Sequence, residues 1–202
     1  MKAVERGTVL VTCFEPFGGR EVNRSEEAVL ALPETVKGRR LFRLTLPVVF
    51  GEAGKTAIAA AERLGAEVVL SVGEAGGRRA VTPELAALNL RYARIPDNRG
   101  QSPLDEPVAA GEENALFSTL PARSMAAAIT SAGLPGEVSS SAGAYVCNDL
   151  FYGLLHAFRG SEVRCGFIHV PAEGFSPEAL SRGIAAAVEV IGKERHHAIP
   201  QG

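Results

Sequence analysis

The sequence predicts an α/β fold, a single-domain three-layer α/β/α sandwich spanning residues 1–202, with a mixed, mainly parallel central sheet. β-branched apolar runs alternate along the chain with Ala-rich stretches of helical periodicity. Of the 202 residues, 46% are hydrophobic and 22% are charged, which is typical of one globular domain with a well-developed core. Strands that alternate with helices pack most simply as a sheet covered on both faces.

Each expected element rests on its own local pattern. Apolar, β-rich runs predict strands, and the amphipathic stretches between them predict helices. The final helix has a clear start, because Ser176 is suited to cap it and Pro177 to occupy its first position. The expected strands are Thr8–Cys13, Arg40–Pro47, Ala66–Val72 and Val163–Val170, and the expected helices are Ser25–Leu32, Gly51–Leu64, Pro121–Ser131, Cys147–Phe158 and Pro177–Ile191.

Other segments are less regular. The alternation within Glu84–Arg94 favours a strand of the mixed sheet over a short helix. The Gly/Pro/Asn/Asp-rich connection over residues 95–116 has no clear periodicity and is longer than most loops, and such loops are often functional or mobile. The tail over residues 193–202 is expected to fray.

Composition limits the class of partner. A net charge of -2 without long Lys/Arg runs argues against nucleic acid and anionic membranes, so we expect a small, non-polymeric partner. No signal peptide or membrane-spanning run is evident. An odd number of cysteines, three, suits a reducing compartment, which predicts a cytoplasmic protein. No group of residues has zinc or calcium spacing, so we expect no metal.

Cys147 is the leading nucleophile. Small residues at 139–144 permit a tight turn before it, and a helical pattern begins just after it. A cysteine at a helix N-terminus meets the positive end of the dipole, which lowers the thiol pKa. The ordinary alternative is a buried structural cysteine. Cys13 and Cys165 fit that alternative, because each lies in or beside an apolar strand with no helix start attached.

His169 is the leading base. It ends an apolar strand, and the carboxyl ends of strands gather catalytic groups in open α/β sheets. By contrast, His156 lies within the helix after Cys147, and His196 and His197 lie in the polar tail. A satisfied core histidine is the alternative for His169, and the presence of a candidate nucleophile favours the catalytic interpretation.

A carboxylate is needed to orient the imidazole and to stabilise its charged form. Glu84 opens a mostly apolar strand, where a buried carboxylate would require a partner. Asp149 follows closely after the candidate nucleophile. Residue spacing alone leaves both carboxylates open.

Two glycine-bearing segments raise the hypothesis of phosphate binding. Gly54-Lys55-Thr56 matches the end of a P-loop, but the first glycine of that motif would fall at Val49. The segment Gly73–Arg78 lacks the dinucleotide-binding spacing and fits a turn at a strand end. Nucleotide binding is therefore the weakest of the functional hypotheses.

Six short motifs occur in order along nearly the whole chain. Together they resemble the pyroglutamyl peptidase I (pyrrolidone-carboxylate peptidase) family of cysteine peptidases, whereas any one of them alone would be weak evidence. The motifs are Phe14–Gly19 with Asn23, Gly73–Arg78, Thr82–Glu84, Ala93–Asn98, Ser141–Asn148 and Phe167–Pro171.

The resemblance implies hydrolysis of the bond after an N-terminal pyroglutamyl residue of peptides, by a thiolate acyl-transfer mechanism without a cofactor. It implies Cys147 as the nucleophile, His169 as the base that later becomes the acid, and Glu84, in preference to Asp149, as their carboxylate partner. It also implies a homo-oligomer, commonly a tetramer.

The resemblance further implies a substrate pocket. Phe14 and Phe17 would hold the flat lactam ring, Asn23 and the backbone around Glu74 would supply polar contacts, and Arg94 would help near the scissile carbonyl. An uncharged lactam offers flat apolar faces and one amide edge, whereas a free ammonium group would be expensive to bury there. Core packing is the alternative for the two phenylalanines, but their Gly/Pro loop favours the pocket.

The chain departs from the family pattern at Cys13, usually Gly, at Arg24, usually Pro, at Glu74, usually Gln, and over residues 172–175. Glu74 matters most, because a carboxylate accepts hydrogen bonds but cannot donate as an amide does, and its charge would raise the pKa of a nearby thiol. A non-catalytic small-ligand binding protein on the same scaffold is therefore the alternative hypothesis. The retained Cys, His and Glu favour the enzyme.

Overall fold

The computed structural model describes residues 7–192 and is organised around a six-stranded sheet of order β2-β3-β1-β4-β10-β5. The four inner strands are parallel, while the two short edge strands β2 and β5 pair antiparallel. This confirms the expected mixed, mainly parallel sheet. The tail over residues 193–202, for which fraying was expected, lies outside the described residues. The strands are β1 (Thr8–Phe14), β2 (Thr35–Val36), β3 (Arg39–Leu46), β4 (Val68–Ala75), β5 (Thr82–Pro83) and β10 (Arg164–Pro171).

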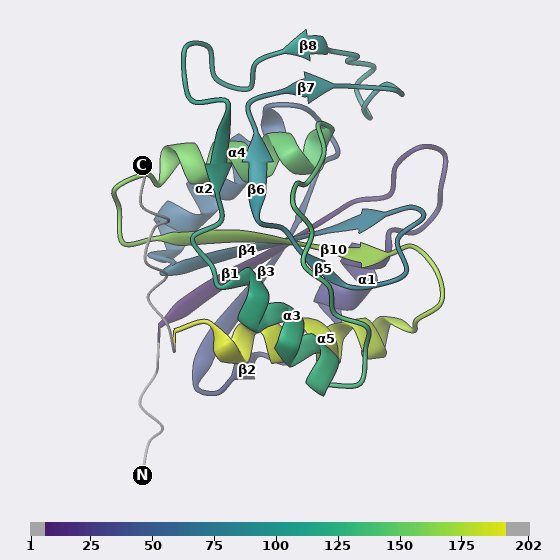
Figure 1. The fold of residues 1–202 in the computed structure, drawn as a ribbon, viewed down its shortest axis with the longest axis vertical. Coiled ribbons are helices and arrows are strands. Elements are labelled where there is room, and N and C mark those ends of the chain that lie inside the picture. Colours follow the sequence, from purple (N-terminus) through teal and green to yellow (C-terminus); the bar gives the residue numbers. More distant parts are fainter. Residues whose placement is uncertain (1–6, 193–202) are drawn as a thin grey trace.

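Helices cover both faces of this sheet (Figure 1). One face is covered by two helices that contact each other, and the opposite face by three. The layers confirm the α/β/α sandwich, and all five expected helices are present with ends shifted by at most two residues. The first face carries α2 (Glu52–Leu64) and α4 (Val146–Ala157), and the second carries α1 (Arg24–Leu30), α3 (Ala122–Ser131) and α5 (Pro177–Val190).

The sheet separates two hydrophobic clusters. Successive side chains of a strand point to opposite faces, so Val9 and Val11 of β1 pack toward α1 and α5, whereas Leu10 packs toward α2 and α4. Because β1, β4 and β10 are buried on both faces, their sequences are continuous apolar runs, which explains why they were predictable. The expected cap of α5 is confirmed, since the side chain of Ser176 accepts from the backbone N–H of Ala179.

The prediction for Glu84–Arg94 was wrong about the sheet. The segment is extended, as expected, but it forms β6 (Ala86–Leu88) and β7 (Arg91–Tyr92) outside the central sheet. β6 pairs with β9 (Ala115–Phe117), and β7 pairs with β8 (Leu104–Glu106). The connection over residues 95–116 therefore contains more regular structure than its sequence indicated.

The side chain of Asn148 explains why this segment leaves the sheet. Its Oδ1 accepts from the backbone N–H of Leu88 at 2.7 Å, and its Nδ2 donates to the carbonyl oxygens of Leu88 at 2.8 Å and Leu90 at 3.0 Å. These bonds hold the segment against α4 instead of beside β5.

Over the described residues, no helix is both long and apolar enough to span a bilayer.

Candidate active site

The candidate site lies at the carboxyl ends of the parallel strands. The chain passes from β1 to β3 on one side and then crosses back to β4 on the other, so the strand order reverses between β1 and β4. Ligands bind at such switch points in open α/β sheets. Phe14 ends β1, and the β4–β10 register pairs Gly73 with His169 and Glu74 with Val170. The sheet itself therefore gathers these residues at one edge.

Cys147 lies in the first turn of α4, as predicted. Gly143 has a φ of 82°, a left-handed conformation that suits glycine, and the helix begins three residues later. A Cβ atom placed on Gly73 would lie only 2.8 Å from Sγ of Cys147. The thiol thus lies directly against the end of β4.

His169 and Glu84 form a buried pair. Nδ1 of His169 lies 2.7 Å from Oε1 of Glu84, and the two residues are 4% and 0% exposed. The backbone N–H of Glu84 also donates to the carbonyl oxygen of Phe167, which fixes the acid beside β10. Because an ionised carboxylate only accepts, Nδ1 carries the ring proton, and Nε2 is left as a proton acceptor.

Arg78 is a contributor that the sequence reasoning missed. Its Nη1 lies 2.8 Å from Oε1 of Glu84, and it also hydrogen-bonds the hydroxyl of Thr82. The signal was present, since Arg78 closes one of the six motifs and Thr82 opens the next. The guanidinium therefore adds a positive charge to the buried Glu84–His169 pair.

The thiol pKa differs from the sequence expectation. Burial raises the pKa of Cys147 to about 12, the charges of Glu84 and Glu74 act in the same direction, and Arg78 opposes them. The helix N-terminus was expected to lower this pKa, but the desolvation of a thiolate outweighs it here. Burial also lowers the pKa of His169, against the raising effect of Glu84. The resting pair is consequently a neutral thiol and a neutral imidazole.

The other two cysteines are core residues, as predicted. Cys13 and Cys165 are 0% and 1% exposed. Burial raises the pKa of Cys13 to about 11 and the pKa of Cys165 to about 12. Neither has a helix start or a histidine partner, so within the described chain Cys147 is the cysteine placed for chemistry.

A small, mainly apolar pocket opens beside the thiol. It brings together Cys147 and four of the predicted substrate-binding residues, and it adds three that were not predicted. Among the additions, Tyr145 packs its ring edge-on against Phe50 at 5.3 Å and tilted toward Phe17 at 6.3 Å. The predicted lining residues are Phe14, Phe17, Asn23 and Glu74, and the additions are Val48, Tyr145 and Val146.

Asn23 shapes the pocket while it also builds α1. Its Oδ1 accepts from the backbone N–H of Ser25 at 3.0 Å and from the Ser25 hydroxyl at 2.8 Å, which caps the helix. Its Nδ2 donates to the carbonyl oxygen of Glu15 at 3.0 Å. Most of its hydrogen-bonding capacity is therefore spent within the protein.

Arg94 is exposed and does not line the pocket, although its segment runs near the site. On one side of it, the N–H of Tyr92 donates to the carbonyl oxygen of Ala144 at 2.8 Å. On the other side, the hydroxyl of Tyr145 donates to the carbonyl oxygen of Pro96 at 3.1 Å. The segment that carries Arg94 thus runs alongside the residues just before Cys147.

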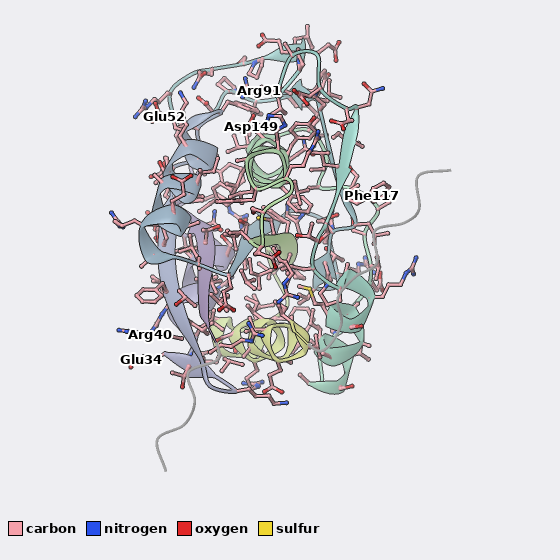
Figure 2. The ribbon with its side chains drawn as sticks, turned by 90° about the vertical axis from the view of Figure 1, so that its left-hand side faces the viewer. Glu34, Arg40, Glu52, Arg91, Phe117 and Asp149 are labelled. Carbon is pink, nitrogen blue, oxygen red and sulfur yellow. The ribbon has the colours of Figure 1, made fainter. Side chains whose placement is uncertain are left out.

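The geometry separates the two candidate carboxylates. Glu84 contacts His169, whereas Asp149 contacts Nε of Arg91 at 2.6 Å and the backbone N–H of Gly51 at 2.7 Å. Figure 2 shows Arg91 and Asp149 beside each other at α4. Asp149 therefore joins α4 to β7 and to the start of α2, away from the imidazole.

A thiol at the start of a helix, at the same sheet edge as a histidine held by a carboxylate, is the set of groups found in cysteine hydrolases. Comparison with known proteins shows to which family of cysteine hydrolases the chain belongs. The family model described as "Pyroglutamyl peptidase" matches residues 7–188, and the chain belongs to this family.

Individual relatives agree with this membership. The pyrrolidone-carboxylate peptidase of Escherichia fergusonii is 48% identical over 81% of this chain and 78% of its own length. That of Levilactobacillus brevis is 42% identical over 91% of this chain and 96% of its own. The crystal structure of Bacillus amyloliquefaciens pyroglutamyl peptidase I superposes with a TM-score of 0.89 at 34% identity, covering 94% of this chain and 98% of that one.

Proposed function

We propose that this protein is a cysteine peptidase that removes an N-terminal pyroglutamyl residue from peptides. The observation that carries the proposal is the position of Cys147 in the wall of a small apolar pocket, at the sheet edge that also holds the His169–Glu84 pair. Membership in the pyroglutamyl peptidase family supports the same reaction.

The pocket chemistry suits the lactam. Phe14, Phe17 and Val48 supply apolar surface, and the buried Glu74 supplies polar atoms at one side. A pyroglutamyl ring has two apolar faces and a single amide edge, so it fits a lining of this kind. An unmodified N-terminus would have to bury its ammonium group at a large desolvation penalty.

The first half of the reaction forms a thioester. Nε2 of His169 takes the thiol proton as Sγ of Cys147 attacks the pyroglutamyl carbonyl carbon. Glu84 stabilises the resulting imidazolium, and the free N–H groups at the start of α4 stabilise the oxyanion. The imidazolium then protonates the leaving amine nitrogen as the C–N bond breaks.

The second half regenerates the enzyme. His169, neutral again, accepts a proton from a water molecule that attacks the thioester carbonyl. The tetrahedral intermediate collapses, the C–S bond breaks, and the imidazolium returns the proton to the sulfur. Pyroglutamate leaves and the thiol is restored. Arg94, on the segment beside Cys147, supplies positive charge near the scissile carbonyl when a peptide is bound.

The wider context of the protein is also part of the proposal. The described residues, 7–192, form one catalytic domain, and the protein acts in the cytoplasm, where the unpaired Cys13, Cys147 and Cys165 suit a reducing environment. A homotetramer rests on the family resemblance alone. A non-catalytic ligand-binding role is the weaker alternative, because a binder has no need of a complete Cys147, His169 and Glu84 set.

The test is release of a fluorescent amine from a pyroglutamyl-coupled substrate, with an alanyl-coupled substrate as the specificity control. We expect turnover of the pyroglutamyl substrate only, and none in Cys147→Ala. A correctly folded wild type that releases nothing would overturn the peptidase proposal and leave ligand binding as the better one.

A further inference from the structure

The pocket wall contains a buried carboxylate. The side chain of Glu74 is only 2% exposed, and it lines the same pocket as Cys147. An isolated buried carboxylate carries a large desolvation penalty, so it must be compensated by donors or positive charge. The compensation comes from two residues of the loop and helix start that follow β1.

Each oxygen of Glu74 has a donor. Oε1 accepts from Nη1 of Arg20, which is the ionic partner. Oε2 accepts from the backbone N–H of Arg24 at 2.7 Å. The guanidinium of Arg24 is directed elsewhere, because its Nη1 pairs with Glu27 at 2.6 Å. Arg24 therefore contributes a backbone donor to the pocket, and Arg20 contributes the charge.

Two departures from the family pattern meet in this cluster. Position 24 is usually Pro in the family that the sequence resembles, and Pro has no N–H to donate. Position 74 is usually Gln, which is uncharged. Arg24 thus provides the hydrogen bond that a proline could not give, to the carboxylate that stands in place of the amide. The replacements at these positions form one physical unit with Arg20.

The two side chains of the Arg20–Glu74 pair differ in their exposure to water. Arg20 has a side chain that is 44% exposed, so water can solvate it without a partner, whereas Glu74 has almost no access to water. Loss of Arg20 would leave an uncompensated negative charge in the pocket. That charge already contributes to the raised pKa of Cys147, and without Arg20 its effect on the thiol would grow.

We infer that Arg20 is a specificity-determining residue, which neutralises Glu74 so that the pocket accepts an uncharged lactam and rejects an N-terminal ammonium group. The inference rests on the proposed function. The ligand that reveals it is a prolyl group, which has a five-membered ring like pyroglutamate but carries a protonated amine in place of the ring amide. An unpaired Glu74 would attract that amine by charge.

The experiment compares wild type, Arg20→Ala, Arg20→Lys and the double variant Arg20→Ala/Glu74→Gln. Each is assayed with the pyroglutamyl substrate and with L-prolinamide as a competitive inhibitor. We expect Arg20→Ala to lose about tenfold or more in kcat/KM and to bind prolinamide about fivefold or more tightly than wild type. Arg20→Lys keeps the charge and retains the selectivity.

The double variant makes the test specific. Glutamine at position 74 removes the charge that Arg20 neutralises, so we expect at least about fivefold recovery of kcat/KM over Arg20→Ala and loss of the extra prolinamide affinity. Arg159→Ala is the matched control. Its side chain is also 44% exposed and also pairs with glutamates, at Glu112 and Glu113, but it lies outside the pocket.

The outcomes separate the two proposals. If wild type is active and Arg20→Ala behaves like Arg159→Ala with both ligands, the inference is wrong and the peptidase proposal stands. If wild type shows no turnover, the affinities of the same variants for pyroglutamic acid amide and prolinamide, measured by calorimetry, decide the inference independently of the peptidase proposal. If Arg20→Ala does not fold, a double variant that folds but does not prefer the lactam over prolinamide overturns it.

Discussion

The thiol of Cys147 lies against the main chain of Gly73, so closely that a Cβ atom on Gly73 would be 2.8 Å from Sγ. The same Cβ would lie 2.9 Å from the ring of Phe167. Ordinary carbon contacts occur at about 3.5–4.0 Å, so this position has no room for a side chain. Because Gly73 pairs with His169 in the sheet, the absence of a side chain at Gly73 allows α4 to hold the thiol against β4, beside the strand that carries His169.

Gly73→Ala is therefore expected to displace the nucleophile. We expect kcat/KM to fall by about 100-fold, since misplacement of a reacting group by about 1 Å has effects of that size, and stability to fall by about 1–3 kcal/mol from overpacking. Steady-state kinetics and thermal melting measure the two effects. Gly76→Ala is the control, because its added Cβ meets nothing within 4 Å. Equal kinetics for the two variants would contradict the expectation.

Glu84→Gln and Asp149→Asn test which carboxylate orients the imidazole. Glu84→Gln keeps the size but removes the charge that stabilises the imidazolium, so kcat is expected to fall by about 10²–10⁴-fold. Asp149→Asn weakens bonds to Arg91 and Gly51 and is expected to lower the unfolding free energy by about 1–3 kcal/mol, with a smaller effect on kcat. The reverse ranking of the two kcat values would assign the role to Asp149.

Arg78→Ala is expected to move the pH profile. Burial lowers the pKa of His169 from its ordinary value of 6.5, Glu84 opposes that shift, and the positive charge of Arg78 lowers the pKa further. Since His169 must be neutral to accept the thiol proton, the acid limb of kcat/KM in wild type is expected below the ordinary imidazole pKa of 6.5. Removal of the guanidinium raises the pKa, so the acid limb moves to higher pH.

The pH dependence of kcat/KM measures this shift, with the exposed neighbour Arg79 replaced by Ala as the control. A purely structural role for Arg78 would lower activity at every pH without moving the limb. An unmoved limb in Arg78→Ala would therefore argue against the electrostatic role.

The sequence predicted the scaffold well because the scaffold is a local property. Strands buried on both faces, such as β1 and β4, are continuous apolar runs, and the cap at Ser176 is a pattern of adjacent residues. The position of β6 and β7 outside the central sheet could not be predicted in this way. It depends on the amide of Asn148, which lies about sixty residues further along the chain.

The residues of the site show the same difference between features that depend on neighbouring residues and features that depend on contacts distant in the sequence. Residue type and position predicted Cys147 and His169, because one stands at the start of a helix and the other at the end of a strand, whereas the Phe14 pocket was predicted from the family resemblance. The contact between Arg20 and Glu74 was not predicted, since the two residues are 54 positions apart and meet only in the folded chain. The direction of the thiol pKa was wrong because burial, which local sequence does not report, outweighs the helix dipole.

The protonation state of Cys147 gives a direct test of that correction. A pKa of about 12 for Cys147 means that the free enzyme holds a protonated thiol throughout the neutral range. A thiolate–imidazolium pair would instead have a thiol pKa of about 3.5–7.5, and its thiolate signal would be constant above that range. We expect the ultraviolet thiolate absorbance that is lost in Cys147→Ala to stay near zero up to about pH 9 and to rise only above it.

Alkylation supplies a second readout of the same quantity. Iodoacetamide reacts with the thiolate, so its rate with Cys147 is expected to keep rising about tenfold per pH unit through the neutral range. Cys13 and Cys165 are buried and give no background at these pH values. A rate that is constant between about pH 5 and pH 9 would show a preformed thiolate. In that case the proton transfer to His169 would precede substrate binding, and would not accompany the attack on the pyroglutamyl carbonyl.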